Sequence, residues 1–395
     1  MFSKTCRITP RGRFDRKARR GAVAVLAAFL MTAMIAMLAF AVDLGYLLVE
    51  KCELQRSADA AALAAAWELA DEGYFKGDAN LTEAIDDARS VAKDFAARNI
   101  VGSINPLVDL NSANLPDGDV VIGYMATWND PYAPLDTSDP SKFNAVRVRV
   151  HRSAIRNGFV PSFFARVLGV DGFSAQGQAT AALASNIVGF RAPPDGSNLG
   201  MLPFALDINT WNDMLAGLTP DQWSWNEDTQ TRTGSGDDIH EGILYPDGTT
   251  PGNFGTIDIG GSNNSTADIA RQILDGLSPE DLAHVGGEVK LDPVTGELDL
   301  NGDTGISAGI SSELASIIGA PRILPIYDQV VGPGNNATFT IVKFVGVRIL
   351  DVKLNGGNKR VVIQPAPVVT KGAIYDDGSS GTSSSMVFTP VRLVQ

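Results

Sequence analysis

Two short motifs in the last third of the chain combine residue types that can do chemistry. The first, Gly305 to Gly309 (GISAG), matches the G-x-S-x-G turn that presents the nucleophilic serine of many hydrolases. That turn needs a strand before the serine, a helix after it and a histidine later in the chain. Here a polar stretch precedes Ser307, and the last histidine of the chain is His284. The motif therefore does not predict a hydrolase.

The second motif, Asp299 to Asp303 (DLNGD), alternates side-chain oxygens in the manner of a calcium-binding loop. Such a loop has glycine at its sixth position and glutamate at its twelfth. This chain has Thr304 and Ile310 there, so the loop offers too few oxygen ligands for a hard cation. We expect an ordinary turn at this place.

The rest of the sequence adds no pattern for catalysis or for a cofactor. It has three histidines and two cysteines, none paired at metal-ligand spacing, and neither a Walker loop nor a G-x-G-x-x-G loop. We assign no catalytic, cofactor-binding or metal-binding residue. The interpretation that follows is a non-catalytic protein without a small-molecule substrate.

The elements of the chain are organised around a long apolar stretch near the N-terminus. From Gly21 to Val42 there is no charged residue, and about 20 apolar residues suffice for a helix to cross a bilayer. From Leu44 to Ala70 the chain has many alanines, a single glycine and no proline, which favours a continuing helix. Residues 21–70 therefore predict a transmembrane helix that continues into a stem.

The charge distribution predicts the orientation of this helix. Residues 1–20 contain eight lysines and arginines and only one acidic residue, Asp15, whereas the whole chain has a net charge of −13. Basic residues stay on the cytoplasmic side of a span. We expect a cytoplasmic tail at 1–20 and an acidic exterior, which disfavours nucleic acid as a partner.

A cleaved secretory signal is the competing interpretation of the same N-terminus. Ala39 to Ala41 fits the small-x-small pattern of a cleavage site. The uncharged run is longer than the roughly 7–15 residues typical of a signal peptide, and apolar residues resume at Leu44. These two observations favour a retained helix.

Several pieces of this region follow one another in a specific order: RRGAVAV at 19–25, an Ala/Leu/Met span, AVDLGYL at 41–47 and ELQRSADAAALAAA at 53–66. In this combination the chain resembles the TadG-like proteins of the tight-adherence (Flp pilus) assembly system. The resemblance implies an inner-membrane protein with an exported C-terminal region and a role in building adhesive surface pili. Relatives that are processed as pseudopilins are cut after a glycine whose fifth following residue is glutamate. Here Leu26 stands at that position after Gly21, which argues against such processing.

The alanine-rich half of the stem is open to two interpretations. Between Ser57 and Ala66 only Leu63 is bulky, and small residues allow a partner helix to approach closely. The stem would then bind other pilus-assembly subunits or a second copy of itself. Alternatively, its apolar stripe packs on the next part of its own chain, as in any amphipathic helix.

Beyond the stem the sequence predicts two exterior α+β modules with largely antiparallel sheets. In the first, residues 71–185, a helix with an apolar stripe from Leu81 to Phe95 is followed by strands at Val120 to Trp128, Asn144 to Arg152 and Phe173 to Leu183. A short helix at Pro161 to Gly169 lies between the last two strands. Alternation in the second strand places His151 on the same polar face as Arg147 and Arg149. With Arg152 and Arg156 these arginines form a cluster that we expect to be a solvated face; the alternative is contact with the acidic surface of a neighbouring subunit.

The second module, residues 186–395, is richer in glycine, proline and asparagine. We expect helices at Ile208 to Leu215 and Ala267 to Gly276, and two successive strands at Ala337 to Val345 and Gly346 to Leu354. Our interpretation is a single-pass membrane component of Flp pilus assembly. The alternative is a membrane-tethered enzyme or binding protein whose site lies in residues 187–395.

Overall fold

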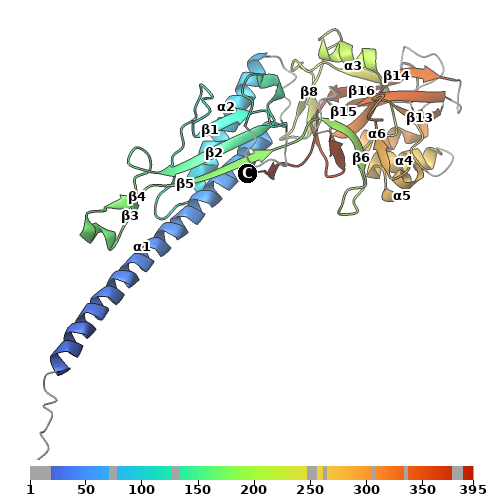
Figure 1. Cartoon of the computed structure of the whole chain (residues 1–395). Coiled ribbons are helices and arrows are strands. Elements are labelled where there is room, and N and C mark those ends of the chain that lie inside the picture. Colours follow the sequence, from blue (N-terminus) through green and yellow to red (C-terminus); the bar gives the residue numbers. More distant parts are fainter. Residues whose placement is uncertain are drawn as a thin grey trace, which may run out of the picture.

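The computed structural model describes residues 19–70, 78–126, 134–246, 256–260, 265–303, 308–332, 337–375 and 386–394. Helix α1 (Arg19–Glu68) is its longest element. At about 1.5 Å per residue, its 50 residues span roughly 75 Å. In Figure 1 the first half of α1 projects away from the rest of the molecule, while its second half lies under the first sheet. The predicted α+β architecture with a long apolar N-terminal helix is confirmed.

The first half of α1 is exposed along its whole length. Side chains from Val23 to Phe40 are largely accessible, and Phe29, Met34 and Leu38 are each more than two-thirds exposed. Among the described residues, one helix is long and apolar enough to cross a membrane, and this is α1. A helix that shows apolar side chains on every side is typical of a membrane span rather than of a soluble surface helix.

The first module is a four-stranded antiparallel sheet in the order β1-β2-β5-β20, covered on one face by α1 and α2. Helix α2 (Asp78–Arg98) agrees with the predicted helix. The first strand ends earlier than expected, at Gly123, and the third is interrupted at Ser174. The strands are β1 (Val120–Gly123), β2 (Ala145–Arg152), β5 (Ala175–Ala182) and β20 (Arg392–Leu393).

The core of this module is built from alanines on the helices and branched residues on the strands. Ala58, Ala62 and Ala65 of α1 are fully buried, as are Val146 and Val148 of β2. Small side chains bring the helix backbone close to the sheet, so the valines of the sheet fill the space between them.

A small hairpin extends from this sheet alongside α1, as Figure 1 shows. Its strands are β3 (Val160–Pro161) and β4 (Gly172–Phe173), and a 3-10 helix, η3 (Ala165–Leu168), lies between them. Helix η3 falls within the predicted short helix and ends, as expected, at Gly169, whose φ of 83° suits glycine.

The second module contains a larger sheet organised on β15 (Ala337–Lys353). One edge of β15 pairs with β14 (Arg322–Val331), and the other edge pairs with β13 (Leu298–Asp303) along its first half and with β16 (Arg360–Pro365) along its second half. The short strands β10 (Gly242–Tyr245), β11 (Thr256–Ile257) and β7 (Leu206–Asp207) extend this sheet.

The prediction of two strands between Ala337 and Leu354 was wrong, because β15 is one continuous strand of 17 residues. Gly346 does not break it. A Cβ atom at this position would overlap the carbonyl oxygens of Ala366 and Met386, so the glycine is needed for close approach of neighbouring backbone. The predicted turn at Asp299 to Asp303 was also wrong, since these residues belong to β13.

Among the described residues, four α-helices complete the second module. Two were predicted closely, α3 (Ile208–Leu215) and α4 (Thr266–Asp275). The others are α5 (Pro279–His284) and α6 (Ser311–Ser316). A second sheet has the order β12-β6-β18, formed by β12 (Glu288–Lys290), β6 (Ile187–Arg191) and β18 (Ala373–Tyr375). The remaining pairs are β8 (Ser224–Asn226) with β9 (Thr231–Thr233) and β17 (Val368–Val369) with β19 (Val387–Phe388).

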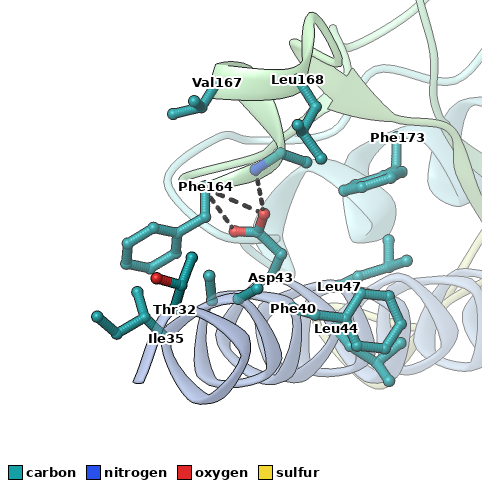
Figure 2. Close-up of a pocket in the computed structure, with 13 residues that line it drawn as sticks. Thr32, Ile35, Phe40, Asp43, Leu44, Leu47, Phe164, Val167, Leu168 and Phe173 are labelled. Atoms are coloured by element: carbon teal, nitrogen blue, oxygen red, sulfur yellow. Dashed lines mark hydrogen bonds between the residues drawn. The ribbon is translucent and has the colours of Figure 1, made fainter. Parts of the chain in front are cut away.

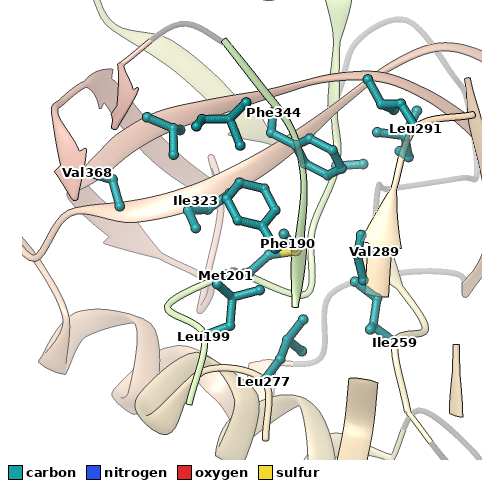
Figure 3. Packing of buried hydrophobic residues seen from close by; sticks show 14 of the residues in the cluster. Phe190, Leu199, Met201, Ile259, Leu277, Val289, Leu291, Ile323, Phe344 and Val368 are labelled. Atoms are coloured by element: carbon teal, nitrogen blue, oxygen red, sulfur yellow. The ribbon is translucent and has the colours of Figure 1, made fainter. Parts of the chain in front are cut away.

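A buried apolar cluster lies between the two sheets of the second module. Figure 3 shows Phe190 of β6 beside Phe344 of β15, with Leu199, Met201 and Leu277 below them. The rings of Phe190 and Phe344 meet edge to face at 5.0 Å. The same cluster includes Met125, Ala145 and Ala182 of the first module, so the apolar core continues from one module into the other.

Candidate functional site

The site with the most specific geometry lies where the exposed half of α1 meets the first module. Asp43 of α1 is only 6% exposed, and its carboxylate faces the start of η3. The backbone N–H groups of Phe163, Phe164 and Ala165 donate to the two carboxylate oxygens over 2.7–3.2 Å. Figure 2 shows the Asp43 carboxylate beside Phe164, with dashed lines for its hydrogen bonds to the residues drawn. A carboxylate at a helix start satisfies N–H groups that have no partner within the helix.

Tyr46, one turn further along α1, continues this contact. Its ring meets Phe163 of the hairpin edge to face, with centroids 5.1 Å apart. Its hydroxyl donates a hydrogen bond of 2.7 Å to Glu50, and this bond, with burial, raises the pKa of Tyr46 above 10.0. Tyr46 therefore links the hairpin to the next charged residue of α1.

Glu50 is the third polar residue on this side of α1 and is almost fully buried. Its carboxylate accepts a hydrogen bond from Arg152, at the end of β2, with the two atoms 3.0 Å apart. The Arg152 guanidinium also donates to the backbone oxygens of Gly158 and Phe159, just before the hairpin. Asp43, Tyr46 and Glu50 are spaced by three and four residues, so they share one face of the helix. We call these three residues and Arg152 the junction cluster.

Above the junction cluster the stem contacts the sheet directly. Gln55 exchanges hydrogen bonds with the backbone of Gln178 in β5, at 2.7 and 3.3 Å. A Cβ atom at Gly177 would overlap the backbone of Leu54 and Gln55, so the helix passes over the strand without any side chain between them. This close approach fixes the angle at which α1 leaves the module.

This packing decides between the two interpretations of the alanine-rich stem. Ala58, Ala61, Ala62, Ala65 and Ala66 are fully buried against α2 and the sheet of the same chain. The expectation that this face binds another subunit was therefore wrong. The small side chains do allow close approach of another element, as predicted, but that element is the chain's own sheet.

The expectation of a solvated arginine face on β2 was only partly right. His151 does share a face with Arg147 and Arg149, and burial, with the charge of Arg149, lowers its pKa. Arg152, however, is buried at the junction, and Arg156 pairs with the carboxylate of Asp119. Most of these arginines hold loops and strands of their own module together.

The residues considered for chemistry are not assembled into a site. Asp299 of β13 accepts a hydrogen bond from Thr340 of the neighbouring strand. The motif from Gly305 to Gly309 lies mostly outside the described residues. Within the part of the chain that the structure describes, no three His, Cys, Asp or Glu side chains are grouped to hold a metal ion. Cys52 is an exposed free thiol, and Cys6 lies outside the described residues.

Sequence reasoning did not identify the junction cluster. Asp43 appeared at the end of the apolar run and within the piece AVDLGYL of the resemblance, and Arg152 appeared in the arginine group, but neither was assigned a partner. A usable signal was present, because Asp43 and Glu50 are seven residues apart in a helix that is otherwise apolar there. Acidic residues at this spacing lie on one side of a helix, next to a partner that compensates their charge.

Comparisons with known proteins match the part of the chain that contains the junction cluster. Residues 21–68 match the family model described as Flp pilus-assembly TadE/G-like, and residues 50–181 match the model described as Tad-like Flp pilus-assembly. Together the two matches cover α1 and most of the first module. No curated protein and no solved structure is similar enough to the chain to count as a match.

Proposed function

We propose that this chain is a TadG-like, single-pass, non-catalytic membrane component of Flp pilus assembly. Its residues 21–181 match two family models of that system. Its basic N-terminus lies in the cytoplasm and its span crosses the inner membrane. Two modules lie on the outer side: residues 71–185, whose sheet is completed by β20 from the end of the chain, and the rest of residues 186–395. Other pilus-assembly subunits are its partners.

The observation that carries this proposal is the division of α1 into two halves. Its first half, up to Phe40, is exposed and apolar, and one face of its second half is buried against the first sheet and α2. One uninterrupted helix therefore provides both the membrane span, with its first half, and part of the core of the exterior module, with its second half. Such a protein transmits the position and tilt of its span directly to its exterior surface, which suits a structural role in assembly.

The continuity of α1 also supports retention of the N-terminus. The helix runs without a break through Ala39 to Ala41, where a signal peptide would be cleaved. Asp43, two residues later, is bound to the hairpin. We expect the mass of the membrane-extracted protein to include the segment before Gly21. A measured mass that corresponds to a chain starting at Ala22 or at Val42 would contradict a retained anchor.

Two experiments test the proposal as a whole. A reporter enzyme that is active only outside the cytoplasm should give signal when fused after Gln395 and none when fused before Met1. In the native host, deletion of the coding sequence should abolish Flp pili on the cell surface, and the full-length chain should restore them. Normal piliation of the deletion strain would overturn the assembly role, and the reverse reporter pattern would overturn the orientation.

A further inference from the structure

We propose that the hairpin of residues 160–173 inserts its tip into the hydrocarbon region of the membrane beside α1, so that the first module is held to the bilayer at a second point. This inference rests on the proposed membrane span. The occupant of the apolar surface around the hairpin is then lipid, and specifically the acyl chains of the leaflet on the exterior side.

The first argument is the exposure of the hairpin tip. Val167 and Leu168 of η3 are each 85% exposed, and Phe163 and Phe164 are about half exposed. Soluble surfaces rarely gather apolar side chains in one contiguous patch. Between Val160 and Phe173 only Arg166 and Asp171 are charged. Aromatic and aliphatic side chains with few charges are typical of segments that enter the membrane interface.

The second argument is the position of the hairpin along α1. A cavity of about 420 Å³ lies between them, and its walls come from the span as well as from the hairpin. Figure 2 shows Thr32 and Ile35 of α1 on the same side as Phe164, and Leu168 and Phe173 across from Leu47. Thr32 precedes Asp43 by roughly 16 Å of helix, about half of a ~30 Å hydrocarbon core. If residues 22–42 cross the bilayer, the hairpin tip lies within its outer half.

The third argument is that several backbone N–H groups of the hairpin have hydrogen-bond partners within the protein and do not depend on water. The N–H groups at the start of η3 are satisfied by Asp43. At its end, Gly169 and Val170 donate to the carbonyls of Arg166 and Ala165, and the hydroxyl of Ser162 donates to the Val170 carbonyl. Irregular backbone is tolerated at membrane depth only when its polar groups are satisfied within the protein. An exposed loop in water has no such requirement.

The two charges of the hairpin fit the same placement. Arg166 and Asp171 are 3.6 Å apart and both are exposed. The long stem of an arginine can reach from an apolar layer to the headgroups while its aliphatic part stays among acyl chains. Asp171 lies next to β4, on the side of the hairpin that returns to the module. Neither charge needs to be buried in hydrocarbon.

The test uses the full chain in proteoliposomes, with Cys6 and Cys52 replaced by serine. A fluorescent label is placed on one cysteine at a time, in the variants Val167→Cys, Ile155→Cys and Leu38→Cys. Ile155 is the matched control, since it is a 95% exposed apolar residue of the same module outside the hairpin. Leu38 reports the span itself. Quenching is measured with acyl-brominated lipids and with aqueous iodide.

The expected result is that the Val167 label is quenched by brominated lipid to about the same fraction as the Leu38 label and is shielded from iodide, while the Ile155 label shows the opposite behaviour. Quenching of Val167 by iodide, with Leu38 still quenched by lipid, would overturn the inference and leave the proposed span intact. Shielding of Val167 from both quenchers would overturn it in favour of contact with a second copy. A Leu38 label open to iodide would overturn the span, and the inference with it.

Discussion

Glu50 of the stem and Arg152 at the end of β2 form a buried ion pair 3.0 Å long between segments that are 102 residues apart in sequence. The pair lies where α1 leaves the first module. Burial of one charge without the other is costly, so each residue constrains the position of the other. The angle between the span and the exterior module therefore depends on this ion pair as well as on the close packing at Gly177.

Arg152→Met should destabilise the first module by about 3–5 kcal/mol, because Glu50 then remains buried without its partner. Hydrogen exchange of β2 and β5 amides measures this loss. The matched control is Arg166→Met, whose ion pair is exposed and should contribute less than about 1 kcal/mol.

In the double variant Glu50→Leu and Arg152→Met, the loss should be smaller than the sum of the two single losses. Strict additivity would show that the two charges do not interact.

Gly177→Ala should loosen the contact between the stem and the sheet. The new methyl group would overlap the backbone of Leu54 and Gln55, and overpacking of this kind costs about 1–3 kcal/mol. Amide exchange should accelerate in α1 from Leu54 to Ala66. Gly234→Ala is the control, because a Cβ atom there meets nothing within 4 Å. Equal protection of α1 in both variants would mean that the close approach at Gly177 is not required.

The sequence predicted the elements of the first module better than their mutual contacts. Apolar periodicity indicated the helix from Leu81 to Phe95, and alternation indicated β2, because each pattern is local. The burial of Ala58 and Ala62 depends on which surface covers them, and a stripe of alanines looks the same whether that surface belongs to this chain or to another. Composition therefore left both interpretations open.

The junction cluster escaped prediction for a related reason. Asp43 and Phe163 are 120 residues apart, and no spacing rule connects a carboxylate in one helix with the backbone of a distant hairpin. Gly346 was expected to begin a second strand, whereas it lies inside the single strand β15. Its actual role depends on Ala366 and Met386, which approach it only in the folded sheet.

Asp43→Ala should release the hairpin from α1. The N–H groups of Phe163, Phe164 and Ala165 would lose their acceptor, and a buried donor left unpaired costs about 1–3 kcal/mol. We expect amide exchange at these three residues to rise about tenfold or more.

Two further variants make this result specific to the carboxylate. Asp43→Asn keeps one acceptor oxygen and should give an intermediate rate. Asp171→Ala removes an exposed hairpin carboxylate and should leave the rate unchanged. A similar rate in all three variants and the original chain would show that Asp43 does not hold the hairpin.

The second module should lose stability in acid through Asp281 of α5. Burial raises the pKa of this carboxyl, but two hydrogen bonds from Arg271, at 2.8 and 2.9 Å, and others from Ser278 outweigh it, so the pKa lies below 3.8. A carboxyl whose pKa is lower in the folded state than in the unfolded state stabilises the fold above the unfolded value. That contribution is complete at neutral pH and is lost as the pH falls below about 3.8 through the lower, folded-state pKa.

Asp281→Asn tests this sign directly. The variant should be less stable than the original chain at pH 7, and the difference in unfolding free energy should shrink as the pH falls below 3.8, because protonation of Asp281 weakens the same hydrogen bonds. Urea unfolding followed by tryptophan fluorescence gives the free energies. Glu280→Gln, an exposed change in the same helix, should leave the pH dependence of the original chain unaltered. A difference between Asp281→Asn and the original chain that stays constant from pH 7 to about pH 3 would show that the ion pair with Arg271 makes no pH-dependent contribution to the stability of this module.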